Sequence, residues 1–138
     1  MLNKAKSILI DNDHKLVIIN NGNIITSDDR GVKALLDLLD RETELSGAYA
    51  ADRVVGKAAA MIYCQLGIRA LYASVISEGA RDILIENGIT LEFEKVVPYI
   101  VNRSGDGMCP MEEAVGDERD QPTAIQRVRD RLKELLSK

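Results

Sequence analysis

The sequence is poor in the residues on which metal sites, disulfide frameworks and membrane segments depend. It contains two cysteines, Cys64 and Cys109, a single histidine, and no apolar run that approaches the roughly 18 residues needed to cross a bilayer. Two cysteines are too few for a disulfide framework and suit a reducing compartment, and no secretory signal follows Met1. We therefore expect a cytoplasmic protein that binds no membrane.

An excess of positive charge is also absent. The chain has 18 lysines and arginines against 22 acidic residues, a net charge of −4 that gives no electrostatic footprint for nucleic acid. Its 138 residues are 46% hydrophobic and 29% charged, which is typical of a globular domain with a buried core. We predict one α/β domain over residues 1–116, followed by a C-terminal amphipathic helix over residues 117–138.

A central helix is predicted from Ala50 to Leu66. Asp52 can cap its start, because a carboxylate accepts the free amide hydrogens of a first turn, and Gly67 can end it in the left-handed conformation. Beyond Arg53 the only charged residue of this segment is Lys57. A helix that is apolar nearly all round is usually buried on most faces, so we expect the domain to be organised around it.

Four strands are predicted around this helix. The β-branched runs over residues 15–20 and 23–27 flank Asn21-Gly22, the strongest short signal for a type I′ hairpin. The run over residues 68–76 is mostly apolar, as in a strand buried on both faces. The run over residues 89–97 alternates between apolar and polar side chains, as in a strand with one wet face near the sheet edge.

The order of these elements predicts the fold class. Helices are also predicted over residues 2–11 and 32–39, and a helix capped by Ser77 separates the last two strands. Strands separated by helices need crossover connections, which place helices on the faces of a sheet. We predict an α/β fold, a three-layer α/β/α sandwich with a mixed sheet that starts with a β-hairpin.

The chain changes character after Pro98. Residues 99–103 can extend a strand, and a glycine-bounded loop then leads into a short helix over residues 108–115 with Pro110 at its first position. The terminal helix carries an apolar stripe at three- and four-residue spacing, formed by Ile125, Val128, Leu132 and Leu135. This stripe packs either on its own domain or across a homodimer.

Three segments together resemble a family of small prokaryotic proteins of unknown function with a cytidine deaminase-like fold. They are Asp52–Ala60, Val97–Arg103 and Cys109–Glu113, and the resemblance spans residues 2–116. It implies an α/β/α sandwich in which the hairpin, the central helix and two further strands lie as in deaminases. Zinc deaminases begin two helices with His-x-Glu and Pro-Cys-x-x-Cys. Here the corresponding helix starts contain no histidine or cysteine, so we expect no zinc and no other cofactor.

Two residues are candidates for catalysis. Lys57 is a lone ammonium on an apolar helix, where burial would lower its pKa toward the range of a base or nucleophile; the alternative is that it follows the one solvent-facing line of the helix. Cys109 stands at the expected start of a short helix, where the dipole would favour a reactive thiolate. Cys64 is expected to be an inert thiol in the core.

Six further residues are candidates for ligand binding, each with a structural alternative. Asp52 and Arg53 would lie at the central helix start, where the dipole favours anions, although Asp52 can simply be a cap. Ser77 and Glu78 repeat this pattern at the next helix. Asn102 and Arg103 follow an apolar run, where ligands bind in α/β sheets, and Arg103 could hold a phosphate or carboxylate with both nitrogens.

Three hypotheses follow from these residues. The first is a non-zinc, deaminase-like domain that binds a small, anionic, nucleotide-like ligand at the start of the central helix. The second is an enzyme that uses Cys109 or Lys57 as its nucleophile. The third is a non-catalytic interaction module that forms a homodimer through the terminal helix.

Overall fold

Five strands form one mixed sheet in the computed structural model, which describes residues 1–29, 32–41 and 45–137. In chain order the strands are β1 (Leu16–Asn20), β2 (Asn23–Ser27), β3 (Tyr49–Val55), β4 (Ala70–Ser77) and β5 (Thr90–Val97). Their order across the sheet is β2-β1-β3-β4-β5. β1 is antiparallel to β2 and β3, whereas β3, β4 and β5 are parallel. The protein therefore has an α/β fold whose mixed sheet begins with a hairpin, as predicted.

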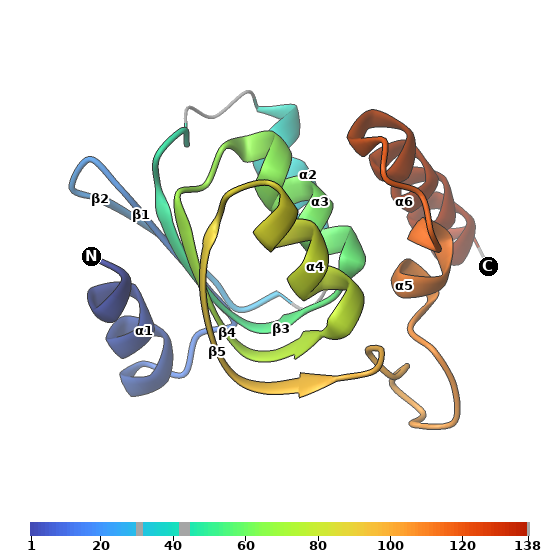
Figure 1. The fold of residues 1–138 in the computed structure, drawn as a ribbon, viewed down its shortest axis with the longest axis horizontal. Coiled ribbons are helices and arrows are strands. Elements are labelled where there is room, and N and C mark those ends of the chain that lie inside the picture. Colours follow the sequence, from blue (N-terminus) through green and yellow to red (C-terminus); the bar gives the residue numbers. More distant parts are fainter. Residues whose placement is uncertain (30–31, 42–44, 138) are drawn as a thin grey trace.

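Helices cover both faces of the sheet (Figure 1). One face carries α1 (Leu2–Asp11), which contacts β1, β3 and β4. The other carries α2 (Lys33–Asp40), α3 (Lys57–Leu66) and α4 (Glu78–Glu86), which share one core with the sheet. Beyond α3 lie α5 (Pro110–Val115) and α6 (Gln121–Leu136). The segment from β5 to α5 thus brings the end of the chain back over the start of α3.

Two separate cores follow from the alternation of side chains along β1. Leu16 and Ile18 face the larger core under α3, while Val17 and Ile19 face the smaller core under α1. Successive side chains of a strand point to opposite faces, so four consecutive apolar residues fill both cores at once. All four are at most 5% exposed. This continuous apolar run is the reason β1 lies inside the sheet and β2 at its edge.

The predicted hairpin and helix ends are confirmed. Asn21 has φ 50° and Gly22 has φ 84°, so both central residues of the turn adopt the positive φ that a type I′ turn requires. Gly67 ends α3 in the left-handed conformation with φ 76°. The Ser77 hydroxyl accepts the backbone N–H of Ala80 at 3.2 Å and caps α4. These features are local, which is why the sequence predicted them.

The prediction that the central helix begins near Ala50 is wrong. Residues Tyr49–Val55 form β3, and the helix starts only at Lys57, after Gly56. β3 pairs with β1 on one side and β4 on the other, and its alanines Ala50 and Ala51 are fully buried against the two opposite cores. Small side chains let helices pack closely on a central strand, so this tertiary setting outweighs the helical propensity of alanine.

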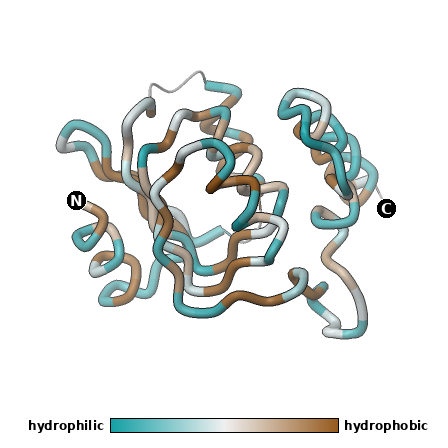
Figure 2. The backbone as a smooth tube through the Cα atoms, viewed as in Figure 1, coloured by the Kyte–Doolittle hydropathy of each residue, from teal (hydrophilic) through white to brown (hydrophobic). Residues whose placement is uncertain are grey.

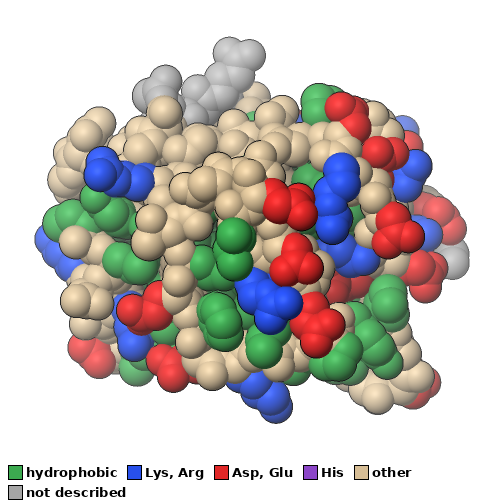
Figure 3. All heavy atoms as spheres, in the orientation of Figure 1, with side chains coloured by type: hydrophobic (Ala, Val, Ile, Leu, Met, Phe, Trp, Pro, Cys, Tyr) green, Lys and Arg blue, Asp and Glu red, His purple; other side chains and the backbone are tan. Residues whose placement is uncertain are grey.

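β5 forms an edge of the sheet, as predicted, but its apolar face is only partly covered. Phe93 remains 39% exposed. Residues 99–103 do not extend this strand, because beyond Val97 only an isolated bridge between Val101 and Met108 is formed. Figure 3 shows the molecule in the orientation of Figure 1. On the side seen there, apolar side chains are mixed with charges of both signs.

α6 packs against α3 and α5. Ala124, Ile125 and Val128 are buried in the main core, whereas Leu136 is 70% exposed. Figure 2 shows α6 as mainly hydrophilic, which agrees with a narrow apolar stripe. The first half of α6 therefore packs on the core of its own domain. Along the stretches of chain that the structure describes, no helix is long and apolar enough to cross a bilayer.

Candidate functional site

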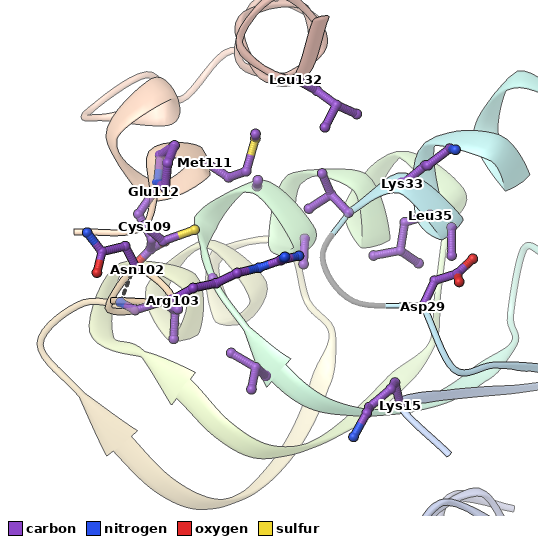
Figure 4. A pocket seen from close by; sticks show the side chains of 18 of the residues that line it. Lys15, Asp29, Lys33, Leu35, Asn102, Arg103, Cys109, Met111, Glu112 and Leu132 are labelled. Carbon is purple, nitrogen blue, oxygen red and sulfur yellow. Dashed lines mark hydrogen bonds between the residues drawn. The ribbon is translucent and has the colours of Figure 1, made fainter. Parts of the chain in front are cut away.

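A cavity of about 860 Å³ lies beside the first turn of α3. Its walls come from α2, α3, α5 and α6, from the ends of β1 and β3, and from the loop that follows β5 (Figure 4). Most of its surface is apolar, and the apolar residues that line it include Val32, Leu35, Ala59, Ile100, Met111 and Leu132. The volume falls in the range of about 300–1,000 Å³ that is typical of small-molecule sites.

Three cations line this cavity without an anionic partner. Arg103 extends from its loop across the cavity toward the wall that holds Leu35 and Lys33 (Figure 4). Within the described part of the chain the side chains of Lys15, Lys33 and Arg103 take part in none of the ion pairs. Six of the other arginines in the described segments pair with carboxylates, whereas Arg103, like Arg41 and Arg69, does not, and of these three only Arg103 lines the cavity.

Asp52 forms part of the cavity wall from β3. Its carboxylate accepts the hydroxyl of Tyr63 at 2.6 Å and the backbone N–H of Val54 at 3.3 Å. Burial raises the pKa of Asp52 to about 6, although both hydrogen bonds act in the opposite direction. The pKa of the fully buried Tyr63 is raised well above its ordinary value by the same burial and by the nearby carboxylate. Asp52 is thus a strand residue, and the prediction that it caps the central helix is wrong.

Arg53 does not lie at a helix start either. Its guanidinium turns to the opposite face of the sheet, where it donates to the backbone oxygens of Leu9 at 3.0 Å and His14 at 3.1 Å. A cation that satisfies the last carbonyls of a helix stabilises that helix end. Arg53 is one of the residues that line the cavity, but its guanidinium fastens α1 to the sheet and is not directed at Asp52.

Lys57 points away from the cavity. Its ammonium donates to the backbone oxygen of Gly116 at 2.7 Å, and its stem passes over Gly79, where an added Cβ would lie 2.8 Å from Lys57 Cδ. The wall of the cavity does not include it. Lys57 and Cys109 therefore do not converge on one pocket, and the contacts of Lys57 tie α3 to the segment before α6.

Glu112 is a residue that the sequence analysis did not select. It is 1% exposed, and its carboxylate accepts the backbone N–H of Lys57 and, at 2.9 Å, that of Ile100. An added Cβ on Gly56 would lie 2.8 Å from Glu112 Oε1, so the glycine leaves room for this carboxylate. Glu112 thus caps α3 from a distant part of the chain. In the sequence Glu112 stands beside a second acidic residue, Glu113, and nothing local distinguishes the buried carboxylate from the exposed one.

Asn102 and Cys109 also line the cavity. The Asn102 side chain is engaged within its own loop, because its amide donates to Asp106 Oδ1 at 3.0 Å and its oxygen accepts the Asp106 backbone N–H. The Cys109 sulfur points toward the cavity (Figure 4), and its backbone N–H donates to Ile100 at 2.8 Å. The loop is therefore internally braced, which holds Arg103 over the cavity.

Ser77 and Glu78 lie outside the cavity wall. Ser77 is buried as the α4 cap, and Glu78 is exposed in the first turn of that helix. Cys64 is partly buried, and burial raises the pKa of its thiol to about 11. In the portions of the chain that the structure describes, no three His, Cys, Asp or Glu side chains gather as a metal site would require.

Comparison with known proteins places these features in a family. The model of TM1506, a domain of unknown function (DUF1893), matches residues 4–132. The crystal structure of a DUF1893 family protein (TM1506) from Thermotoga maritima is similar, with a TM-score of 0.86 and 29% sequence identity. The alignment covers 94% of this chain and 88% of that one. A search of curated proteins found no match.

Proposed function

Because the chain belongs to the DUF1893 family of domains of unknown function, we propose its role from the geometry of the cavity: it binds a small anionic ligand beside the start of α3. The observation that carries the proposal is the unpaired Arg103 guanidinium, which reaches over an apolar cavity. An arginine can bind a phosphate or carboxylate through two parallel hydrogen bonds.

Lys15 and Lys33 support the same role. Both line the cavity, and neither is paired with a carboxylate among the described residues. Asp29 is the one other acidic side chain of the wall besides Asp52 and Glu112, and the Glu112 carboxylate is already occupied by two backbone N–H groups. The described part of the wall therefore holds three unpaired cations, and the Glu112 carboxylate is turned to backbone N–H groups and not to them, although the whole chain carries −4.

We also propose that the fold is cytidine deaminase-like and lacks zinc chemistry. The hairpin at one edge, the buried α3 and the parallel strands β4 and β5 support this assignment. Zinc deaminases place a histidine or cysteine at their helix starts, whereas α3 begins Lys57-Ala58-Ala59 and α4 begins with Glu78. In this proposal the cavity beside the start of α3 is a ligand site, and side chains bind the ligand without a zinc ion.

A nucleoside monophosphate is the first ligand to test, because it combines an anionic group with a flat base whose faces are apolar. We expect adenosine 5′-monophosphate to raise the melting temperature of the wild type and to bind by isothermal titration calorimetry. Arg103→Ala should weaken binding by tenfold or more, as expected for the loss of a charged hydrogen-bonding partner. Lys33→Ala should weaken it less, because a single flexible ammonium makes a smaller contribution.

Arg69→Ala is the matched control. Arg69 is an exposed arginine at the start of β4, at the other end of the parallel strands from the cavity, and is absent from the ion pairs of the described residues. Its loss removes the same charge without touching the site, so binding should be unchanged. The proposal fails if neither nucleotides nor simple phosphate esters bind, or if Arg69→Ala weakens binding as much as Arg103→Ala.

A second candidate function is an enzyme that uses Cys109 as its nucleophile, because its sulfur faces the cavity. Lys57 is not part of this version, since its ammonium is bonded to Gly116 on another side of α3. The histidine of the chain lies elsewhere, with its Nδ1 2.9 Å from Asp28. Alkylation of Cys109 at pH 7 much faster than that of free cysteine would support the enzyme, and a rate no faster would remove it.

A further inference from the structure

We propose that the Asp52 carboxylate accepts a hydrogen bond from a hydroxyl group of the ligand. The site would then select phosphate esters that carry free sugar hydroxyls, such as nucleoside monophosphates. This inference rests on the proposed anion site and adds a second recognition point to it. Arg103 and the lysines would take the phosphate, and the apolar wall would take the base. Asp52 would then decide between ligands that have a sugar diol and ligands that lack one.

The hydrogen bonds of Asp52 leave it with unused acceptor capacity. Tyr63 donates to Oδ2 at 2.6 Å, and the Val54 backbone N–H donates to Oδ1 at 3.3 Å. An ionised carboxylate has about four acceptor positions and no donor. Tyr63 and the backbone N–H groups of Val54 and Arg53 occupy three of these positions, so unused acceptor capacity remains. Asp52 is one of the residues that line the cavity. Only a donor can use this acceptor capacity, which excludes a second anionic group at this point.

No cation of the described residues neutralises Asp52. The nearest one along the chain, Arg53, is turned to the other face of the sheet and bonded to the backbone oxygens of Leu9 and His14. Lys15 lines the same cavity but forms no ion pair with Asp52. A carboxylate that is withdrawn from water without a cation is costly. A ligand hydroxyl that donates to this carboxylate would recover part of the cost. Its hydrogen bond to Asp52 would therefore be stronger than the same hydrogen bond in water.

Tyr63 makes Asp52 a fixed acceptor. The tyrosine is fully buried within α3, and its hydroxyl holds one carboxylate oxygen from behind. Burial raises the pKa of Asp52 to about 6, so at pH 7.5 the group is ionised and accepts but does not donate. A carboxyl group whose environment disfavours its charge, in the wall of a cavity, is a common mark of a functional site.

A matched pair of ligands tests this inference on the wild type itself. Adenosine 5′-monophosphate and its 2′,3′-dideoxy counterpart share the base and phosphate and differ only in the sugar hydroxyls. At pH 7.5 we expect calorimetry to show at least tenfold tighter binding of the ligand with hydroxyls, because a hydrogen bond to a charged group is among the strong ones. Equal affinities for the two ligands would overturn the inference.

Three variants separate this inference from the anion site. Asp52→Asn should bind both ligands with the affinity that the wild type shows for the dideoxy form. Asp11→Asn, a change of the same chemistry at an exposed carboxylate that does not line the cavity, should preserve the preference for hydroxyls. Arg103→Ala should lower the affinity for both ligands by the same factor. If both ligands bind equally and Arg103→Ala weakens them, the anion site stands and the role of Asp52 is refuted. If neither binds, both proposals fail.

Discussion

The carboxylate of Glu112 accepts the backbone N–H of Lys57, so that a residue of α5 caps the start of α3 from 55 positions further along the chain. The same carboxylate also accepts the Ile100 backbone N–H at 2.9 Å. One buried side chain thus joins α3, the loop after β5 and α5. Because Ile100 and Cys109 line the cavity, Glu112 fixes the wall from which Arg103 extends.

Loss of the Glu112 carboxylate is expected to destabilise the protein strongly. Glu112→Ala leaves two buried N–H groups without acceptors, each of which costs about 1–3 kcal/mol. We expect a decrease of about 3 kcal/mol or more in the free energy of unfolding, measured by urea denaturation. Glu112→Gln keeps one acceptor oxygen and should cost about half as much.

Glu113→Ala is the control for this helix, because Glu113 is exposed and pairs with Arg131 at 3.2 Å on the surface. Exposed ion pairs contribute about 0–1 kcal/mol. If the two alanine variants were equally stable, Glu112 would not be the residue that holds α5 on α3.

Lys57 is expected to affect stability and not ligand binding. Lys57→Met keeps an unbranched stem over Gly79 but removes the ammonium that donates to Gly116. The loss of one partly buried hydrogen bond should lower the free energy of unfolding by about 1 kcal/mol. Its affinity for adenosine 5′-monophosphate should stay within twofold of the wild type by calorimetry. If Lys57→Met bound adenosine 5′-monophosphate tenfold more weakly and was as stable as the wild type, Lys57 would be a ligand-binding residue and this prediction would be wrong.

The free energy of unfolding should depend on pH through the titration of Asp52. Burial raises the pKa of Asp52 from 3.8 to about 6 in the folded state, so between these values the folded protein holds a proton that the unfolded chain releases. Its contribution to stability is therefore complete below about pH 4 and is lost as the pH rises through 6. Asp52→Asn cannot ionise, so relative to the wild type it should gain about 1–3 kcal/mol between pH 4 and pH 7.

Urea denaturation at pH 4, 5, 6 and 7 measures this difference, and Asp120→Asn gives a control of opposite sign. Hydrogen bonds from the Thr123 hydroxyl and backbone N–H lower the pKa of Asp120. Its contribution to stability is present above the unfolded-chain pKa of 3.8 and is lost only as the pH falls below it, so this variant should be less stable than the wild type by a nearly constant amount from pH 4 to pH 7. A pH-independent difference for Asp52→Asn would show that its carboxyl does not titrate between pH 4 and 7.

The two cysteines should differ in their reaction with iodoacetamide. Burial raises the pKa of the Cys64 thiol to about 11, so little thiolate forms at pH 8 and modification should be slow. Cys109 lines an accessible cavity and should react first, as followed by mass spectrometry of Cys64→Ala and Cys109→Ala. Saturating adenosine 5′-monophosphate should slow the reaction of Cys109 alone. Faster modification of Cys64 than of Cys109 would contradict this assignment.

The comparison of β3 with α3 shows where local sequence information misleads. Residues Ala50 to Leu66 contain many alanines, and taken alone they favour one long helix. In the fold, Tyr49–Val55 is clamped between β1 and β4, and the small side chains of Ala50 and Ala51 let helices pack on both faces. Strand pairing is a long-range interaction, so a propensity computed along the chain does not contain it.

By itself the sequence determined the features whose causes lie within a few residues: the Asn21-Gly22 turn, the Ser77 cap, the end of α3 at Gly67 and the α/β order of elements. It also pointed to Arg103 and Cys109, and to Asp52 by residue type alone, because Asp52 was predicted at a helix start and lies in β3. Only the tertiary structure decided which of the candidates share one cavity and which serve the fold. Arg53 and Lys57 are turned away, and Glu112 is brought to α3, by contacts between segments about 40 to 60 residues apart. Such contacts depend on how the sheet and helices pack, which no local pattern encodes.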